Sequence, residues 1–137
     1  MLLLVTKIMQ AEVFALAPEL PAHAAAEVLV DRGFDTAPVL SEAGTLIGMV
    51  SLTELTRATT GATVGDVMLK TVPAVRNDST AMEAAQFMAT GGHDWLLVIG
   101  PFGMILGVVT ALDVVRALAA GLPLAPDAEV VFDRMAS

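Results

Sequence analysis

Two short stretches of this chain place a hydroxyl residue three positions before a carboxylate, directly after an apolar run. Thr110 precedes Asp113 after "GVV", and Ser51 precedes Glu54 after "GMV". At this spacing the two residues can form a capping box, in which each side chain accepts a hydrogen bond from the backbone of the other. Such a cap stabilises the start of a helix by about 1 kcal/mol without any ligand. The chemistry predicted for both stretches is hydrogen bonding at a strand-to-helix turn.

Other kinds of reactive site find little support in the sequence. The chain has no Cys, which excludes disulfides, thiolate metal sites and a Cys nucleophile. His23 and His93 stand apart in the sequence from other candidate ligands. The nucleophile motif G-x-S-x-G and the phosphate-binding P-loop are both missing. We therefore expect no catalytic residues and no metal site.

Composition and charge narrow the class of partner. The 137 residues are 55% hydrophobic, and 7 basic residues against 15 acidic ones give a net charge of −8. This charge argues against binding a nucleic-acid backbone. Residues 95–112 carry no charge, but Gly100, Pro101 and Gly103 indicate a turn within that stretch. We expect two buried strands there, no membrane segment and a cytoplasmic location.

The sequence repeats itself once. Shifting it by 59 positions aligns residues 5–58 with residues 64–117 without a gap. Identical pairs include Gly48 with Gly107 and Val50 with Val109. Self-similarity at a fixed offset indicates repeated structural units. Because two copies are too few for a solenoid, we expect a closed pair, with one unit at residues 5–60 and a second at 61–120. The tail at 121–137 is expected either to form a short helix or to be loose.

Each copy predicts the same order of elements. A short β-like segment, residues 13–16 or 72–75, precedes an amphipathic helix with alanines at i, i+3 and i+4 spacing. Thr80 with Glu83 predicts a capping box, and Gly33 and Gly92 are placed to end the helices in the left-handed conformation. Two strands with a turn and a last helix follow. The predicted fold class is α+β, with two β-α-β-β-α units related by pseudo-two-fold symmetry, sheets packed together and helices outside.

At this point the chain resembles a tandem pair of cystathionine-β-synthase (CBS) domains, also called a Bateman module. The resemblance rests on "VTKIM" and "VGDVM" at the unit starts, and on "APVL" to "LIGMVS" and "LLVI" to "ILGVVT" later in each copy. It covers about residues 5–120. It implies a stand-alone regulatory or sensor module that signals to a partner protein. The ligand classes implied are AMP, ADP or ATP, S-adenosylmethionine, NAD(H) and cyclic dinucleotides, with no required cofactor.

The resemblance also implies two clefts between the units. In such pairs the hydroxyl and acid of the last strand-to-helix turn hold the ribose, and the first two strands of the other unit hold the adenine. The first cleft would use Ala15, Phe34, Asp35, Thr110 and Asp113. The second cleft would use Ser51, Glu54, Ala74, His93 and Asp94.

The sequence also departs from the family pattern. Glu54 is one methylene longer than the acid of the pattern, so the Thr110 and Asp113 cleft is the stronger of the two. Asp35 and Asp94 stand where relatives often carry basic residues for phosphates, which favours a neutral or cationic adenosyl ligand. Arg57 and Arg116 are spaced to pair with the two acids. The alternative function is a ligand-free interaction or dimerisation protein, and a homodimer is expected in either case.

Overall fold

The computed structural model describes residues 2–122, and its elements follow the repeat. The predicted tail helix falls on residues 123–137, which lie outside the described residues. The first copy contains the 3₁₀ helix η1 (Val5–Lys7), α1 (Ala22–Arg32), β1 (Thr36–Leu40), β2 (Leu46–Ser51) and α2 (Leu52–Thr56). The second contains α3 (Val64–Val67), β3 (Ala74–Arg76), α4 (Ala81–Gly91), β4 (Trp95–Ile99), the 3₁₀ turn η2 (Pro101–Gly103), β5 (Ile105–Thr110) and α5 (Ala111–Ala119).

The amphipathic helices form where the alanine spacing predicts them. In α1, all four residues of the predicted face are buried: Ala22, Ala25, Ala26 and Leu29. Gly33 and Gly92 follow α1 and α4 with φ of 77° and 70°, the left-handed conformation that glycine adopts most easily. Thr80 and Glu83 form the predicted capping box at the start of α4. The predicted helix boundaries are thus confirmed.

The strands form two small sheets. β1 pairs antiparallel with β2, and β4 pairs antiparallel with β5. β3 adds to β4 in parallel, so the second sheet has the order β3-β4-β5. The uncharged stretch 95–112 therefore contains the β4-β5 hairpin, with buried residues in both strands and an exposed turn where its glycines and proline predict one. No helix in the described part of the chain is long and apolar enough to cross a membrane.

The first predicted strand, residues 13–16, is reduced to a single bridge. Leu16 pairs in parallel with Val39, while its counterpart segment in the second copy forms the full strand β3. The cause lies in proline. Asn77 donates its N–H to Ile99 O in the second copy, but Pro18, at the equivalent position, has no N–H to donate. On the other side of Leu16, Leu97 N–H donates to Pro73 O in the second copy, but its equivalent Pro38 has no N–H either. The ladder of the first copy is therefore reduced to Leu16.

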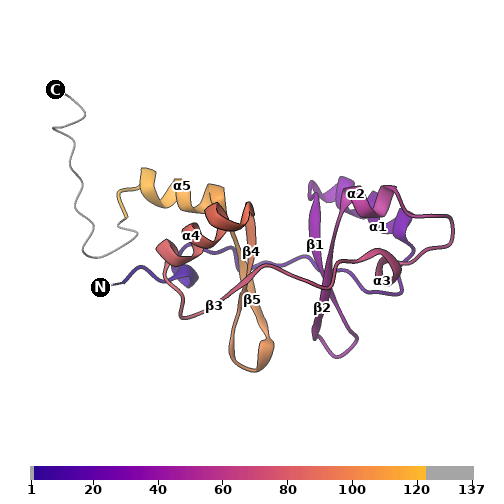
Figure 1. The fold of residues 1–137 in the computed structure, drawn as a ribbon, viewed down its shortest axis with the longest axis horizontal. Coiled ribbons are helices and arrows are strands. Elements are labelled where there is room, and N and C mark those ends of the chain that lie inside the picture. Colours follow the sequence, from indigo (N-terminus) through magenta and orange to yellow (C-terminus); the bar gives the residue numbers. More distant parts are fainter. Residues whose placement is uncertain (1, 123–137) are drawn as a thin grey trace.

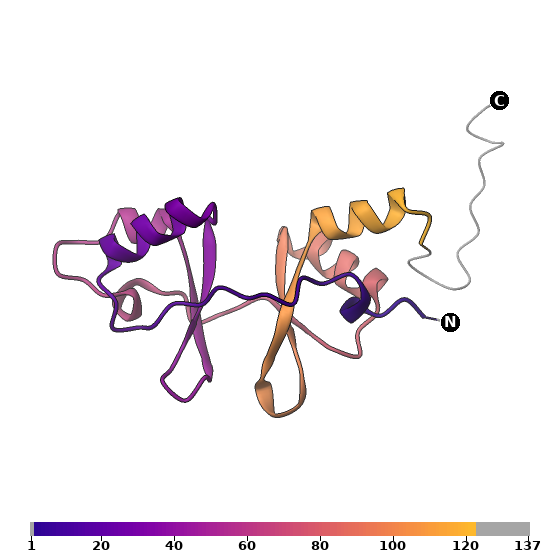
Figure 2. The same cartoon turned by 180° about the vertical axis from the view of Figure 1, so that it is seen from behind.

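The segment at the start of each copy packs on the sheet of the other copy. Val5 belongs to the core around β4, β5 and α4, while Val64 belongs to the core around β1, β2 and α1. Gln10 pairs with Val108 of β5, and Leu69 pairs with Met49 of β2. Figure 2 shows the N-terminal trace crossing from one unit to the other. These two segments, the straps (residues 5–12 and 64–71), each join one unit to the other.

The units lie side by side, with the hairpins innermost and the helices toward the outside (Figure 1). The helices α1 and α2 cover the β1-β2 hairpin, and α4 and α5 cover the β4-β5 hairpin. This is the predicted α+β arrangement of two related units. It brings the start of β1 and the end of β5 to the boundary between the units, where the first cleft is predicted.

Candidate functional site

A cavity of about 230 Å³ opens at the boundary between the two units. Segments of both copies line it: the N-terminal strap, the α1–β1 junction and the strands β4 and β5. Its lining residues are Gln10, Glu12, Val13, Phe14, Gly33, Phe34, Asp35, Thr36, Pro38, Trp95, Val108 and Thr110. The lining combines aromatic walls with a few polar groups, which is the usual character of a small-molecule site.

A second cavity of about 570 Å³ adjoins the first. It shares with the first cavity the residues Gln10, Asp35, Thr36, Trp95 and Thr110. It adds Asp94 before β4, and Ala111, Leu112 and Arg116 of α5. Because the linings overlap, the two cavities form one continuous cleft along the β5–α5 turn.

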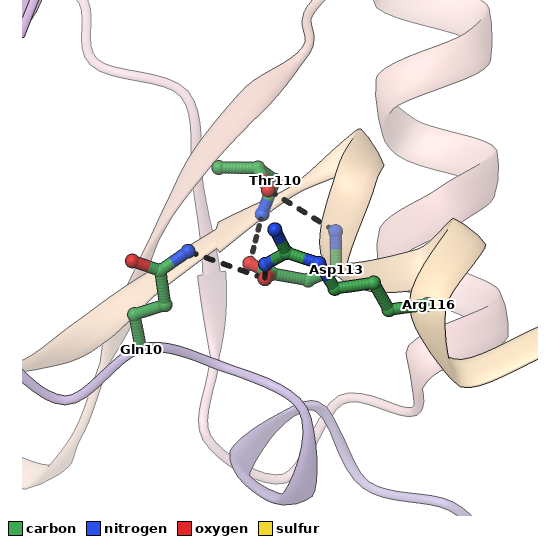
Figure 3. Close-up of polar contacts among 4 residues, drawn as sticks. All are labelled: Gln10, Thr110, Asp113 and Arg116. Atoms are coloured by element: carbon green, nitrogen blue, oxygen red, sulfur yellow. Dashed lines mark hydrogen bonds and ion pairs between the residues drawn. The ribbon is translucent and has the colours of Figure 1, made fainter. Parts of the chain in front are cut away.

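The β5–α5 turn at this cleft carries the predicted capping box (Figure 3). The backbone N–H of Thr110 donates to Asp113 Oδ2 at 2.9 Å, and the N–H of Asp113 donates to Thr110 Oγ1 at 3.2 Å. Asp113 is only 6% exposed. The turn holds a buried carboxylate in a fixed orientation directly behind Thr110, which lines the cleft.

Two further side chains approach the same carboxylate. Gln10 of the N-terminal strap donates from Nε2 to Asp113 Oδ1 at 3.2 Å. Arg116 Nη1 lies 3.9 Å from the same oxygen, one turn further along α5. The predicted pairing of Arg116 with Asp113 is therefore present, although the guanidinium is largely exposed and screened by solvent.

Aromatic rings form the opposite wall of the first cavity. Phe14 and Phe34 stack with ring centroids 5.7 Å apart and an interplanar angle of 4°. The guanidinium carbon of Arg32 lies 4.5 Å from the centroid of the Phe14 ring, a cation–π contact. Arg32 is thus a basic group beside the cleft that the sequence spacing did not predict.

The predicted residues of the first cleft are brought together in part. Phe34, Asp35 and Thr110 line the cavities. Ala15 is not among the lining residues, where its neighbours Val13 and Phe14 are found instead. Asp113 lies beneath the surface of the cleft, covered by Gln10.

The predicted residues of the second cleft are dispersed among several surfaces. Ser51 and Glu54 form their capping box, with the Ser51 N–H donating to Glu54 Oε1 at 2.8 Å. Asp94 faces the same cavity as Thr110, and His93 lines a separate apolar pocket between α4 and α5. Ala74 begins β3. Of these five residues, only Asp94 lines the cleft at the unit boundary.

Sequence reasoning missed Gln10 and Glu12 as cleft residues. Both belong to the strap, whose path across β5 depends on contacts with residues about a hundred positions away. One signal was available in the repeat itself. Gln10 aligns with Leu69, so a polar amide stands at a position that is apolar in the other copy.

Comparison with known proteins accounts for the repeat. The family model for the CBS domain matches residues 5–61 and again residues 64–120. The chain belongs to the CBS domain family. The solved CBS-pair protein CBSX2 from Arabidopsis thaliana, in complex with AMP, is 26% identical to this CBS pair with a TM-score of 0.78. That match covers 86% of this chain and 97% of CBSX2.

Other relatives agree on the fold of the CBS pair. The cytosolic domain of the Mg²⁺ channel MgtE, in complex with ATP, is 27% identical with a TM-score of 0.72, over 80% of this chain and 46% of that chain. The CBS pair of protein MJ0100, in complex with 5′-methylthioadenosine and S-adenosyl-L-methionine, has a TM-score of 0.76, and its identity of 20% shows the fold alone.

Curated relatives are much longer proteins. Over 58 residues the chain is 40% identical to homoserine O-acetyltransferase from Methanosphaerula palustris. Over 104 residues it is 25% identical to inosine-5′-monophosphate dehydrogenase from Thermoplasma acidophilum. The chain spans 12% and 21% of the length of these two proteins.

Proposed function

We propose that this CBS pair is a regulatory module that binds an adenosine-containing ligand in the cleft between its units. The observation that carries the proposal is the position of the Thr110 and Asp113 capping box directly at the cleft. A carboxylate has four acceptor positions and can receive both hydroxyls of a ribose. Solved relatives contain AMP or ATP, which supports the adenosine class.

The cleft offers a distinct place for each part of such a ligand. The apolar wall formed by Val13, Phe14 and Phe34 suits an adenine, whose edge the strap backbone can read. The ribose would lie toward Thr110, at the start of α5. This division follows the chemistry of the lining from apolar to polar.

Charge around the cleft favours ligands with few phosphates. Glu12 and Asp35 line the first cavity, and Asp35 and Asp94 line the second. Arg116 is the basic residue of the second lining and is already near Asp113. A neutral or cationic adenosyl compound such as 5′-methylthioadenosine or S-adenosylmethionine is therefore expected to bind more tightly than ATP.

We assign no catalytic step to the module. Among residues 2–122, no cluster of three or more His, Asp or Glu side chains is placed to hold a metal ion. Its output would reach a partner protein through a shape change at the unit boundary. The two repeats, residues 5–60 and 61–120, act as the two halves of that module.

A second copy of the chain is the proposed partner for the outer helices. Leu112, Val115 and Leu118 of α5 are 54%, 56% and 54% exposed, at i, i+3 and i+6. Together they give α5 an apolar outer stripe next to its buried face. Burial of such a stripe in a two-fold dimer removes apolar area from water on both copies.

The ligand proposal is tested by thermal unfolding with a panel of compounds. The panel holds AMP, ADP, ATP, 5′-methylthioadenosine, S-adenosylmethionine, NADH and cyclic di-AMP. A ligand present at about 100 times its Kd stabilises the folded state by about 2.7 kcal/mol, which raises Tm by several degrees. We expect at least one adenosyl compound to do so with the wild-type protein.

Two Asp→Asn variants locate the effect. Asp113→Asn keeps the side-chain shape at the cleft but removes the charge that accepts the ribose, so the ligand shift should be lost. Asp66→Asn makes the same change in the capping box of α3, where Asp66 Oδ2 accepts the Thr63 N–H at 2.9 Å. Asp66 lines neither cavity. It should retain the full ligand shift. A folded wild-type protein that no compound stabilises would argue for the ligand-free interaction role instead.

A further inference from the structure

Asp113 is the buried charged residue of the described chain, and each oxygen of its carboxylate already accepts one hydrogen bond. Oδ2 accepts the Thr110 N–H at 2.9 Å, and Oδ1 accepts the Gln10 amide at 3.2 Å. Arg116 lies 3.9 Å from Oδ1. A ribose presents two adjacent hydroxyls as donors, and both need acceptor positions on the same carboxylate. The Thr110 contact is part of the helix cap, so the Gln10 contact is the one that a ligand can replace.

Gln10 stands between the cleft and this carboxylate. Gln10 is exposed and lines both cavities, whereas Asp113 lines neither. Figure 3 shows the Gln10 side chain reaching Asp113 from the strap, on the side opposite α5. A ligand in the cleft therefore meets Gln10 before it meets Asp113.

The other copy of the repeat provides an internal comparison. Leu69 occupies the position equivalent to Gln10, and its backbone pairs with Met49 at 2.8 and 2.9 Å. Gln10 pairs with Val108 at the same two distances. The strap backbone is thus the same in both copies, and only the side chain differs. Because Leu69 has no donor, the hydrogen bond to the capping acid is specific to the copy with the favoured cleft.

We propose that the Gln10 amide occupies the place of a ribose hydroxyl at Asp113 and that an adenosine ligand must displace it to bind. The inference rests on the proposed ligand cleft and adds a specificity-determining residue to it. A compound gains from Asp113 only if its hydroxyls replace the lost amide contact. Ribosides are therefore favoured over 2′-deoxyribosides, which offer only one of the two hydroxyls.

Displacing Gln10 also couples the ligand to the strap. The Gln10 backbone stays paired with β5, and the same strap carries Val5 into the core of the second unit. Movement of the Gln10 side chain thus occurs at the point where the two units are joined. The cost is small, because an exposed amide gives up a single hydrogen bond.

The side-chain amides give a direct spectroscopic test. The chain holds only three residues with such amides, Gln10, Asn77 and Gln86, so each amide signal in a nitrogen–proton NMR spectrum is assigned by one substitution. In the ligand-free protein, the Gln10 amide should exchange with water more slowly than the exposed amide of Gln86, and Asp113→Asn should shift it. Identical behaviour of Gln10 and Gln86 in the ligand-free protein would overturn the proposal without any ligand.

Binding measurements complete the test, with AMP, 5′-methylthioadenosine and 2′-deoxyadenosine monophosphate as probes in calorimetric titrations. Gln10→Leu removes the donor and copies the other repeat, and Gln10→Ala removes the side chain as well. Both variants should bind the ribosides about two- to tenfold more tightly than the wild type, the range expected for loss of one competing hydrogen bond. At saturation, the Gln10 amide of the wild type should come to exchange like that of Gln86.

The outcomes separate this inference from the proposed function. Riboside binding that is equal or weaker in both Gln10 variants would mean that Gln10 holds the ligand or supports Asp113, which contradicts displacement. Absence of binding by wild type and both variants alike would instead refute the ligand cleft itself. The Tm of each ligand-free variant, expected within about 5 °C of wild type, confirms that the fold is intact.

Discussion

At the level of single residues, one glycine in each repeat has the same structural role. Gly107 and Gly48 begin the equivalent stretches "GVVT" and "GMVS". A Cβ at Gly107 would stand 2.5 Å from Gln10 O, and a Cβ at Gly48 would stand 2.7 Å from Leu69 O. Each glycine therefore makes room for the strap that comes from the other copy. Without that room, Gln10 could not reach Asp113.

Replacing Gly107 by Ala should push the strap away from β5. The clash is with backbone, which cannot move as a flexible side chain can, so we expect a loss of about 1–3 kcal/mol in the free energy of unfolding. Urea unfolding measures it. Gly91→Ala is the matched control, because its new Cβ meets only the exposed ring of His93. Equal stability of the two variants would contradict this account of the strap.

Of the contacts around Asp113, only those between residues close in the sequence could be predicted. The box of Thr110 and Asp113 was predicted from spacing alone, because a cap depends on residues three positions apart. The contact between Gln10 and Asp113 joins residues 103 positions apart. No local pattern encodes it, so the cover over the carboxylate emerged only from the fold.

At the level of helices and strands, sequence patterns predicted the helix ends and the hairpin turn, but not how the first segment of each copy pairs and packs. The glycine stops after α1 and α4 and the turn between β4 and β5 are all local features and were predicted. The predicted strand at 13–16 keeps only the bridge at Leu16, because Pro18 and Pro38 each remove a donor from its ladder. The packing of Val5 and Val64 on opposite units depends on the whole path of the straps, which periodicity does not contain.

At the scale of the whole molecule, the outer stripe of α5 leads to a prediction about assembly. The double variant Val115→Glu with Leu118→Glu puts charges into the proposed interface, where burying them without partners is costly. The wild type should sediment at twice the 14.2 kDa of the chain, and the double variant at 14.2 kDa.

A control for that prediction lies in the same unit, away from α5 on the β4-β5 hairpin. Met104, after the turn between β4 and β5, is 54% exposed, as is Leu118. Met104→Glu should leave the dimer intact. A wild-type monomer at all concentrations, or dissociation by Met104→Glu as well, would contradict the assignment of α5 as the interface.

The fluorescence of a single side chain, Trp95, tests most directly whether a ligand binds between the two units. Trp95 is the only Trp, the chain has no Tyr, and Trp95 lines both cavities. Titration with AMP and with 5′-methylthioadenosine should change the Trp95 fluorescence saturably, at the concentrations that raise Tm, and Asp113→Asn should lose the change. A compound that stabilises the protein but leaves Trp95 emission unaltered would contradict the account, because its site would then lie away from the cleft.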